Sequence, residues 1–168
     1  MTSKINISQI FMDHMDTLRN EGTDEISKID LSIFIGVPLL FALAYYVLGW
    51  SLSKDATNLI ITGMSIFAGL MINVLVLIYT VALNTKTETE TAEEAYVEKR
   101  FLRQIFANIS FSISTSVLIV VILGASFFLG LRTQNVLSTA AIFLLGNFLL
   151  TLLMTLKRLH IPLSKRFS

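Results

Sequence analysis

The chain contains 168 residues, of which 54% are hydrophobic and only 15% are charged. Soluble domains usually carry about 25% charged residues, so this chain has too few to cover the surface of a soluble globule. Its 13 basic and 12 acidic residues leave a net charge of +1, which excludes a nucleic-acid binder that works by bulk positive charge. The absence of cysteine excludes disulfides, thiolate metal sites and cysteine catalysis.

Four long segments contain no charged residue: 31–53, 56–85, 104–131 and 133–156. A membrane-crossing helix needs about 20 predominantly apolar residues, and each segment provides them. We therefore predict an all-α polytopic membrane protein with four transmembrane helices in two hairpins. The spans are expected at about 31–52, 57–83, 106–130 and 134–156.

The basic residues predict the orientation of these spans. Three of them lie in the N-terminal segment 1–30, four in the central connection 84–105 and four in the tail 157–168. The two short turns carry one each, Lys54 and Arg132. Because lysine and arginine accumulate in cytoplasmic loops, we expect both termini and the central connection to face the cytoplasm.

The N-terminal segment predicts an amphipathic helix over residues 4–19, ahead of the first span. Its apolar residues recur at helical spacing: Ile7, Ile10, Phe11, Met15 and Leu18. Two interpretations stay open, packing on the protein's own cytoplasmic part or lying in the lipid interface. Asp13, His14 and Asp16 are close in sequence, but we assign Asp13 and Asp16 to the wet face of this helix rather than to a metal site.

The first span contains Pro38, which is expected to kink the helix because proline removes a backbone hydrogen bond. Tyr45, Tyr46 and Trp50 lie toward its outer end, at the level of the lipid headgroups that amphipathic rings prefer.

The central connection predicts a second amphipathic helix. No proline or glycine separates it from the third span, so we expect one continuous helix of about 35–40 residues. Glu90, Glu94 and Glu98 form an acidic stripe beside Tyr96. This stripe is either a solvated face or a docking face for a soluble cytoplasmic partner.

Basic residues near the ends of the third and fourth spans are expected at the membrane surface, where they attract anionic lipids. They are Lys99, Arg100, Arg103, Lys157, Arg158, Lys165 and Arg166.

Three spans carry stripes of uncharged polar and small residues at a spacing of four. The stripes are Ser65, Gly69 and Asn73; Asn108, Ser112 and Ser116; and Asn147, Thr151 and Thr155. Such residues allow close helix packing, within or between protomers, and they also line polar pathways. The sequence leaves both interpretations open.

Residue patterns typical of catalysis are missing. The sequence has no glycine-rich phosphate loop and no Gly-x-Ser-x-Gly motif, and its two histidines lie at opposite ends of the chain. None of the four spans contains an ionisable Asp, Glu, Lys, Arg or His, which disfavours an ion-coupled transporter. We therefore expect no enzyme, no catalytic residue, no cofactor and no metal.

Three segments resemble small four-span bacterial membrane subunits of anti-phage defence systems, such as that of the Kiwa system. They are DLSIFIGVP at 30–38, SIFAGLMIN at 65–73 and FANISFS at 106–112. The resemblance implies a protein that oligomerises in the bacterial inner membrane and works with a soluble cytoplasmic partner. No catalytic residue is carried over from it.

Two functions are expected from these observations. The first is a non-enzymatic inner-membrane subunit that forms homo-oligomers and couples the membrane to a cytoplasmic protein, as a sensor or scaffold in defence. The alternative is a pore-forming or membrane-disrupting effector, in which the polar stripes line a channel after oligomerisation. Nucleic acid is not an expected partner.

Overall fold

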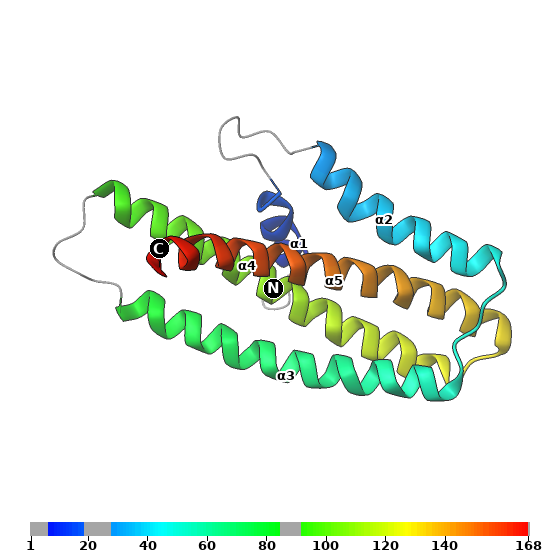
Figure 1. The fold of residues 1–168 in the computed structure, drawn as a ribbon. Helices are drawn as coiled ribbons and strands as arrows, with labels where there is room; N and C mark the ends of the chain where they lie inside the picture. The colour runs from blue at the N-terminus through cyan, green and yellow to red at the C-terminus, as the bar shows by residue number, and fades with distance from the viewer. Residues whose placement is uncertain (1–6, 19–27, 85–91, 168) are drawn as a thin grey trace.

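The computed structural model describes residues 7–18, 28–84 and 92–167. Within these ranges the chain is helical, without any strand (Figure 1). The helices are α1 (Ile7–Asp16), α2 (Lys28–Val47), α3 (Lys54–Asn84), α4 (Ala92–Ser126) and α5 (Leu131–Phe167).

Four of these helices are long and apolar enough to cross a membrane. The candidate membrane segments are Ile29–Val47, Lys54–Thr80, Lys99–Ser126 and Arg132–Leu159. The prediction of an all-α chain with four membrane-spanning helices is therefore confirmed at this level. Numerous large apolar side chains on their outer faces are exposed, as expected for helices whose surroundings are lipid tails rather than water.

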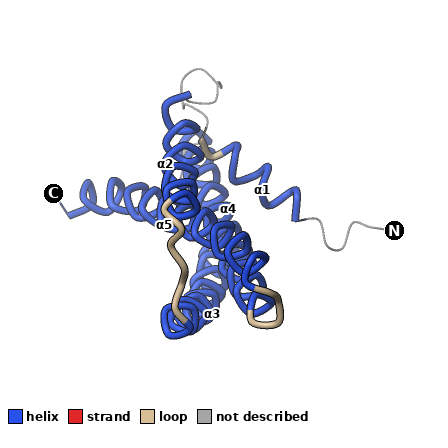
Figure 2. The backbone as a smooth tube through the Cα atoms, turned by 90° about the vertical axis from the view of Figure 1, so that its right-hand side faces the viewer, coloured by secondary structure: helices blue, strands red, loops and turns tan. Residues whose placement is uncertain are grey.

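The four long helices form a row rather than a closed square (Figures 1 and 2). α4 and α5 pack together in the middle, α3 packs on α4, and α2 packs on α5. Among the described residues, α2 and α3 make no contact with each other. The expected first hairpin is therefore not a packed pair: α2 and α3 follow each other in the chain but do not pack together. α2 packs on α5 and α3 packs on α4 instead.

The turn between α2 and α3 has local causes. Gly49 adopts a positive φ of 65°, a conformation that suits glycine and ends α2. Ser53 then caps α3, since its Oγ accepts a hydrogen bond from the Ala56 backbone N–H at 3.1 Å.

The core lies between α3, α4 and α5. It consists of Met64, Ile119, Leu123, Ala141 and Phe148. Ile119 and Leu123 lie one helical turn apart on α4 and are fully buried, as is Phe148 of α5. Phe67 of α3 meets the Phe148 ring edge-on, with ring centroids 5.7 Å apart. This contact links the edge helix α3 to the central helix α5.

α4 is continuous over 35 residues, as the absence of proline and glycine in its first part led us to expect. α5 is continuous over 37 residues and includes Pro162, so the basic segment that follows the fourth span belongs to the same helix up to Phe167. α1 packs on α4, partway along it.

Candidate functional site

The imidazole of His14 projects from α1 into the space between α2 and α4. Its ring stacks on Phe111 of α4, with centroids 3.9 Å apart and planes only 7° from parallel. The ring of Phe34 on α2 meets His14 edge-on at 5.9 Å. Only 3% of His14 is exposed. A polar ring so placed needs a hydrogen-bond partner, because burying an unpaired polar group costs about 1–3 kcal/mol.

The side chain of Asn108 on α4 supplies that partner. Its Oδ1 lies 2.9 Å from His14 Nδ1 and also accepts a hydrogen bond from Thr17 Oγ1 at 2.9 Å. Since an amide oxygen only accepts, the proton of a neutral His14 sits on Nδ1. The Thr17 hydroxyl lies 2.7 Å from the His14 carbonyl as well. These contacts fasten the end of α1 to the middle of α4.

The Asn108 amide nitrogen is the exception in this network. Asn108 is completely buried, yet Nδ2 has no hydrogen-bond partner within the described part of the chain. A buried network with one unsatisfied member is costly, and such a group is commonly tied to a functional role or to a water molecule.

A third helix, α5, contacts the end of the α1 segment through the side chain of Arg158. Its guanidinium donates one hydrogen bond to the Thr17 carbonyl and another, at 3.1 Å, to Gln104 Oε1 of α4. On the outer side of α1, Asp13 lies 3.7 Å from Arg103 of α4. We call His14, Thr17, Asn108 and Arg158 the α1 cluster.

The environment of the α1 cluster favours a neutral His14. Burial lowers the pKa of the imidazole below its ordinary value of 6.5, and the positive charge of Arg158 lowers it further. The hydrogen bond to Asn108 opposes the shift without reversing it.

Two of the predicted polar stripes face the inside of the protomer. Asn108, Ser112, Ser116, Thr151 and Thr155 are buried, and Asn147 is half-buried. Apart from Asn108, their side chains bond to their own helix one turn back: Ser112 to the Asn108 carbonyl, Ser116 to Ser112, Asn147 to Phe143, Thr151 to Asn147 and Thr155 to Thr151, at 2.8–3.0 Å. The hydroxyls are thereby satisfied inside an apolar bundle.

The third stripe points the other way. Ser65, Gly69 and Asn73 are exposed, while Met64, one residue from Ser65, is buried against α4. Ser65 satisfies its hydroxyl by donating to the Ile61 carbonyl at 2.8 Å. No hydrogen bond of the Asn73 amide is found among the described residues, and no atom lies within 4 Å of a Cβ built on Gly69. The face of α3 with this stripe, which we call the α3 face, is free in the protomer.

The expected docking face lies largely outside the described residues. Glu90 falls in an undescribed range, and the side chains of Glu94, Tyr96 and Glu98 are not described, although their backbone is part of α4. Of the basic residues expected at the membrane surface, Lys99, Arg103 and Lys157 are exposed and Arg100 is half-exposed. The side chains of Lys165 and Arg166 are likewise outside the description.

The sequence pattern placed Asn108 in a polar stripe but did not indicate its partners, His14 in α1 and Thr17 in the turn that follows. A signal existed, because Ile10, His14, Thr17 and Leu18 share one helical face. The contact itself joins residues 94 positions apart, and no local pattern encodes that separation.

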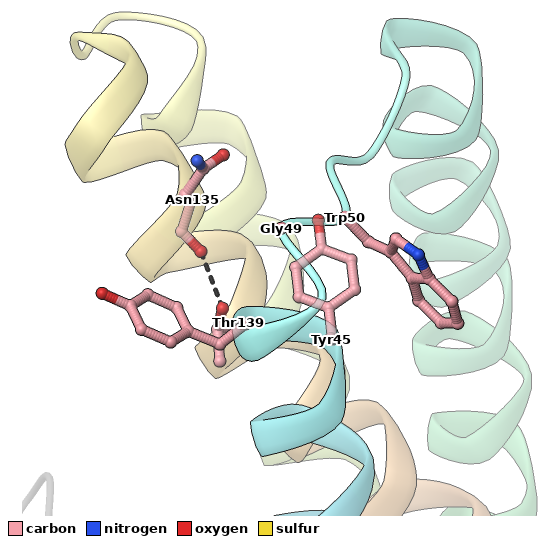
Figure 3. Close-up of a pocket in the computed structure, with 6 residues that line it drawn as sticks. Tyr45, Gly49, Trp50, Asn135 and Thr139 are labelled. Carbon is pink, nitrogen blue, oxygen red and sulfur yellow. Dashed lines mark hydrogen bonds between the residues drawn. The ribbon is translucent and has the colours of Figure 1, made fainter.

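A second feature is a pocket of about 300 Å³ toward the opposite end of α2 (Figure 3). It is lined by Tyr45, Tyr46, Gly49, Trp50, Asn135 and Thr139. Thr139 donates to the Asn135 carbonyl at 2.8 Å, whereas the buried Tyr45 hydroxyl has no partner among the described residues. Its lining combines aromatic and uncharged polar side chains and contains no ionisable acid or base with an ordinary pKa near neutrality.

The chain matches no protein-family model, and neither a curated protein nor a solved structure shows detectable similarity to it. Among the described residues, no three His, Asp or Glu side chains are grouped so that they could hold a metal ion.

Proposed function

We propose that this protein is a non-enzymatic, multi-pass subunit of the bacterial inner membrane that forms homo-oligomers and couples the membrane to a soluble cytoplasmic protein. In this proposal both termini face the cytoplasm, in line with the uneven distribution of basic residues. The role is that of a sensor or scaffold, and the resemblance of three sequence segments to defence subunits supports a role in anti-phage defence.

The observation that carries the proposal is the α1 cluster. His14 and Thr17, outside the membrane-spanning helices, share hydrogen bonds with Asn108, and α5 reaches the same segment through Arg158. Phe34 of α2 adds a ring contact with His14. A small helix in contact with three spans responds when any of them shifts, and this is the connection that a membrane sensor needs.

Homo-oligomerisation is supported by the α3 face. An asparagine amide in a lipid-facing position is costly, and a second copy of the chain would provide both a hydrogen-bond partner and a surface for close approach at Gly69. In the same proposal, Glu94 and Tyr96 on α4 belong to the face that a cytoplasmic protein binds.

The alternative, a pore-forming effector, is favoured by the same exposed stripe. Ser112 and Thr151 are buried within the protomer, so a pore wall would have to come from α3 residues such as Asn73. A pore is built from copies around an axis, and an uncharged polar stripe suits its water-facing side.

Expression in bacteria with a membrane-potential dye separates the two functions. For the subunit, we expect an intact potential and co-purification of a soluble protein that is lost on Tyr96→Ala or Glu94→Lys. Constant depolarisation that Asn73→Leu abolishes would favour the pore instead. If none of these three variants differs from the wild type, both assignments are wrong.

A further inference from the structure

α1 depends on its contacts with the bundle for its position. It has only 10 residues, and isolated helices of that length are marginal in water. Its large side chains Phe11 and Met12 are 53% and 66% exposed, so they contribute little burial. The buried residues at its end are His14, Thr17 and Leu18, each 3% exposed. Docking of α1 therefore rests on a few side chains, with His14 at their centre.

We propose that α1 is a latch that acid opens: protonation of the His14 imidazole releases α1 from its seat on α4 and uncovers the Asn108 side chain.

The site that holds the His14 ring, which we call its seat, is formed by Phe34, Phe111 and Asn108. This site suits a neutral imidazole and not a cation. From α2 the ring meets Phe34, which brings no charge, and from α5 it faces the guanidinium of Arg158, which repels an imidazolium. Beside this site, Asp13 of α1 forms an ion pair with Arg103 of α4, so their opposite charges largely offset each other. Asp16 is exposed on the same helix.

Two contacts favour the cation, but burial outweighs them. The face of Phe111 and the Oδ1 of Asn108 would each attract an imidazolium. Against them stands the loss of water around a side chain that is 97% covered, and burial is the largest influence on the pKa of His14, which it lowers. A protonated His14 is therefore better accommodated in water than in its seat.

Acidification is expected to weaken the docking of α1 on α4. Released His14 has its ordinary pKa of 6.5, while docked His14 has a lower one. Above that ordinary value both forms are neutral, and docking is at full strength. As the pH falls below it, the released form binds the proton first, so docking weakens with acidification until the docked form titrates as well.

The natural lack of cysteine makes a direct test possible. Leu18→Cys introduces a single thiol at a buried position directly after α1, and Met12→Cys introduces one at an exposed position within α1. Maleimide labelling of each full-length variant in detergent or liposomes is measured between about pH 7.5 and pH 5.5. The ratio of the two rates removes the thiol's own pH dependence. We expect this ratio to rise on acidification, by at most about tenfold one pH unit below the ordinary pKa.

Substitution of the proposed sensor makes the test specific. His14→Asn keeps an N–H donor toward Asn108 Oδ1 but does not titrate, so its labelling ratio should be independent of pH. A flat ratio in the otherwise wild-type chain overturns the proposal, as does an unchanged rise in His14→Asn.

A second variant decides the case in which His14→Asn no longer docks at any pH. Asn108→Asp places a carboxylate next to Nδ1, which favours the imidazolium in the docked state. Acidification should then no longer raise the labelling ratio, and a rise equal to that of the parent chain contradicts the latch. Because labelling reports α1 docking in this chain alone, the outcome is separate from that of the proposed oligomer and partner.

Discussion

Gly146 of α5 lies directly against the Pro38 ring of α2. A Cβ built on Gly146 would approach the Pro38 Cβ to 2.9 Å and its Cγ to 3.2 Å. Pro38 is among the most completely buried residues of the chain, although it lies on an edge helix. The proline expected to kink the first span thus packs tightly against α5, and only a residue without a side chain fits opposite it.

Gly146→Ala should therefore destabilise the protein. Forcing a methyl group into a filled contact costs about 1–3 kcal/mol. The matched control is Gly124→Ala in α4, where nothing lies within 4 Å of the built Cβ. Both substitutions replace a helical glycine with alanine, which by itself favours the helix, so a lower thermal unfolding midpoint in detergent for Gly146→Ala than for Gly124→Ala reports the Pro38 contact. Equal midpoints would contradict this packing.

Arg158→Ala should loosen α1. It removes the hydrogen bonds to the Thr17 carbonyl and to Gln104, and hydrogen bonds from a charged group contribute about 1.5–3 kcal/mol. Lys157→Ala, at the exposed neighbouring position, removes an equal charge without these contacts. Labelling of Leu18→Cys at neutral pH should accelerate in the Arg158 variant only. Equal acceleration in both would point to net charge rather than to the α1 cluster.

Tyr45→Phe should leave stability unchanged or raise it slightly. The Tyr45 hydroxyl is buried without a partner among the described residues, so removing it relieves an unsatisfied polar group and keeps the ring. Tyr46→Phe is the control, because Tyr46 is 57% exposed in the same pocket lining. A clear loss of thermal stability for Tyr45→Phe but not for Tyr46→Phe would show that the hydroxyl has a partner, such as a molecule in the pocket.

Gly69→Leu should shift the protein from oligomer to monomer without unfolding it. Gly69 lies on the α3 face, where a larger side chain would separate two helices that approach closely. Gly63→Leu is the matched control, since it lies on the same helix, also has no atom within 4 Å of its built Cβ, and is not part of the stripe. Mass measurements in detergent or nanodiscs should show monomers for Gly69→Leu and oligomers for Gly63→Leu. The same oligomer in both variants would remove the α3 face from the interface.

Much of the architecture was predictable because each step is local. Four charge-free segments predict the four helices that are long and apolar enough to cross a membrane, and the lack of a helix breaker before Asn108 predicts the continuous α4. Which of the polar stripes are buried within the protomer and which are exposed could not be predicted in this way. Ser112, Thr151 and Asn73 have the same kind of pattern in sequence, yet the first two are buried in the protomer and the third is exposed.

What the sequence by itself determined is the number of helices able to span a membrane and the uncharged character of their central parts, because a charged group at the centre of a lipid bilayer is costly. The tertiary structure alone decided that α2 packs on α5 rather than on α3, and that His14 meets Asn108. The reason is geometric. Helical periodicity fixes the angles between residues on one helix, but the rotation of each helix relative to its neighbours depends on how all of their side chains fit together.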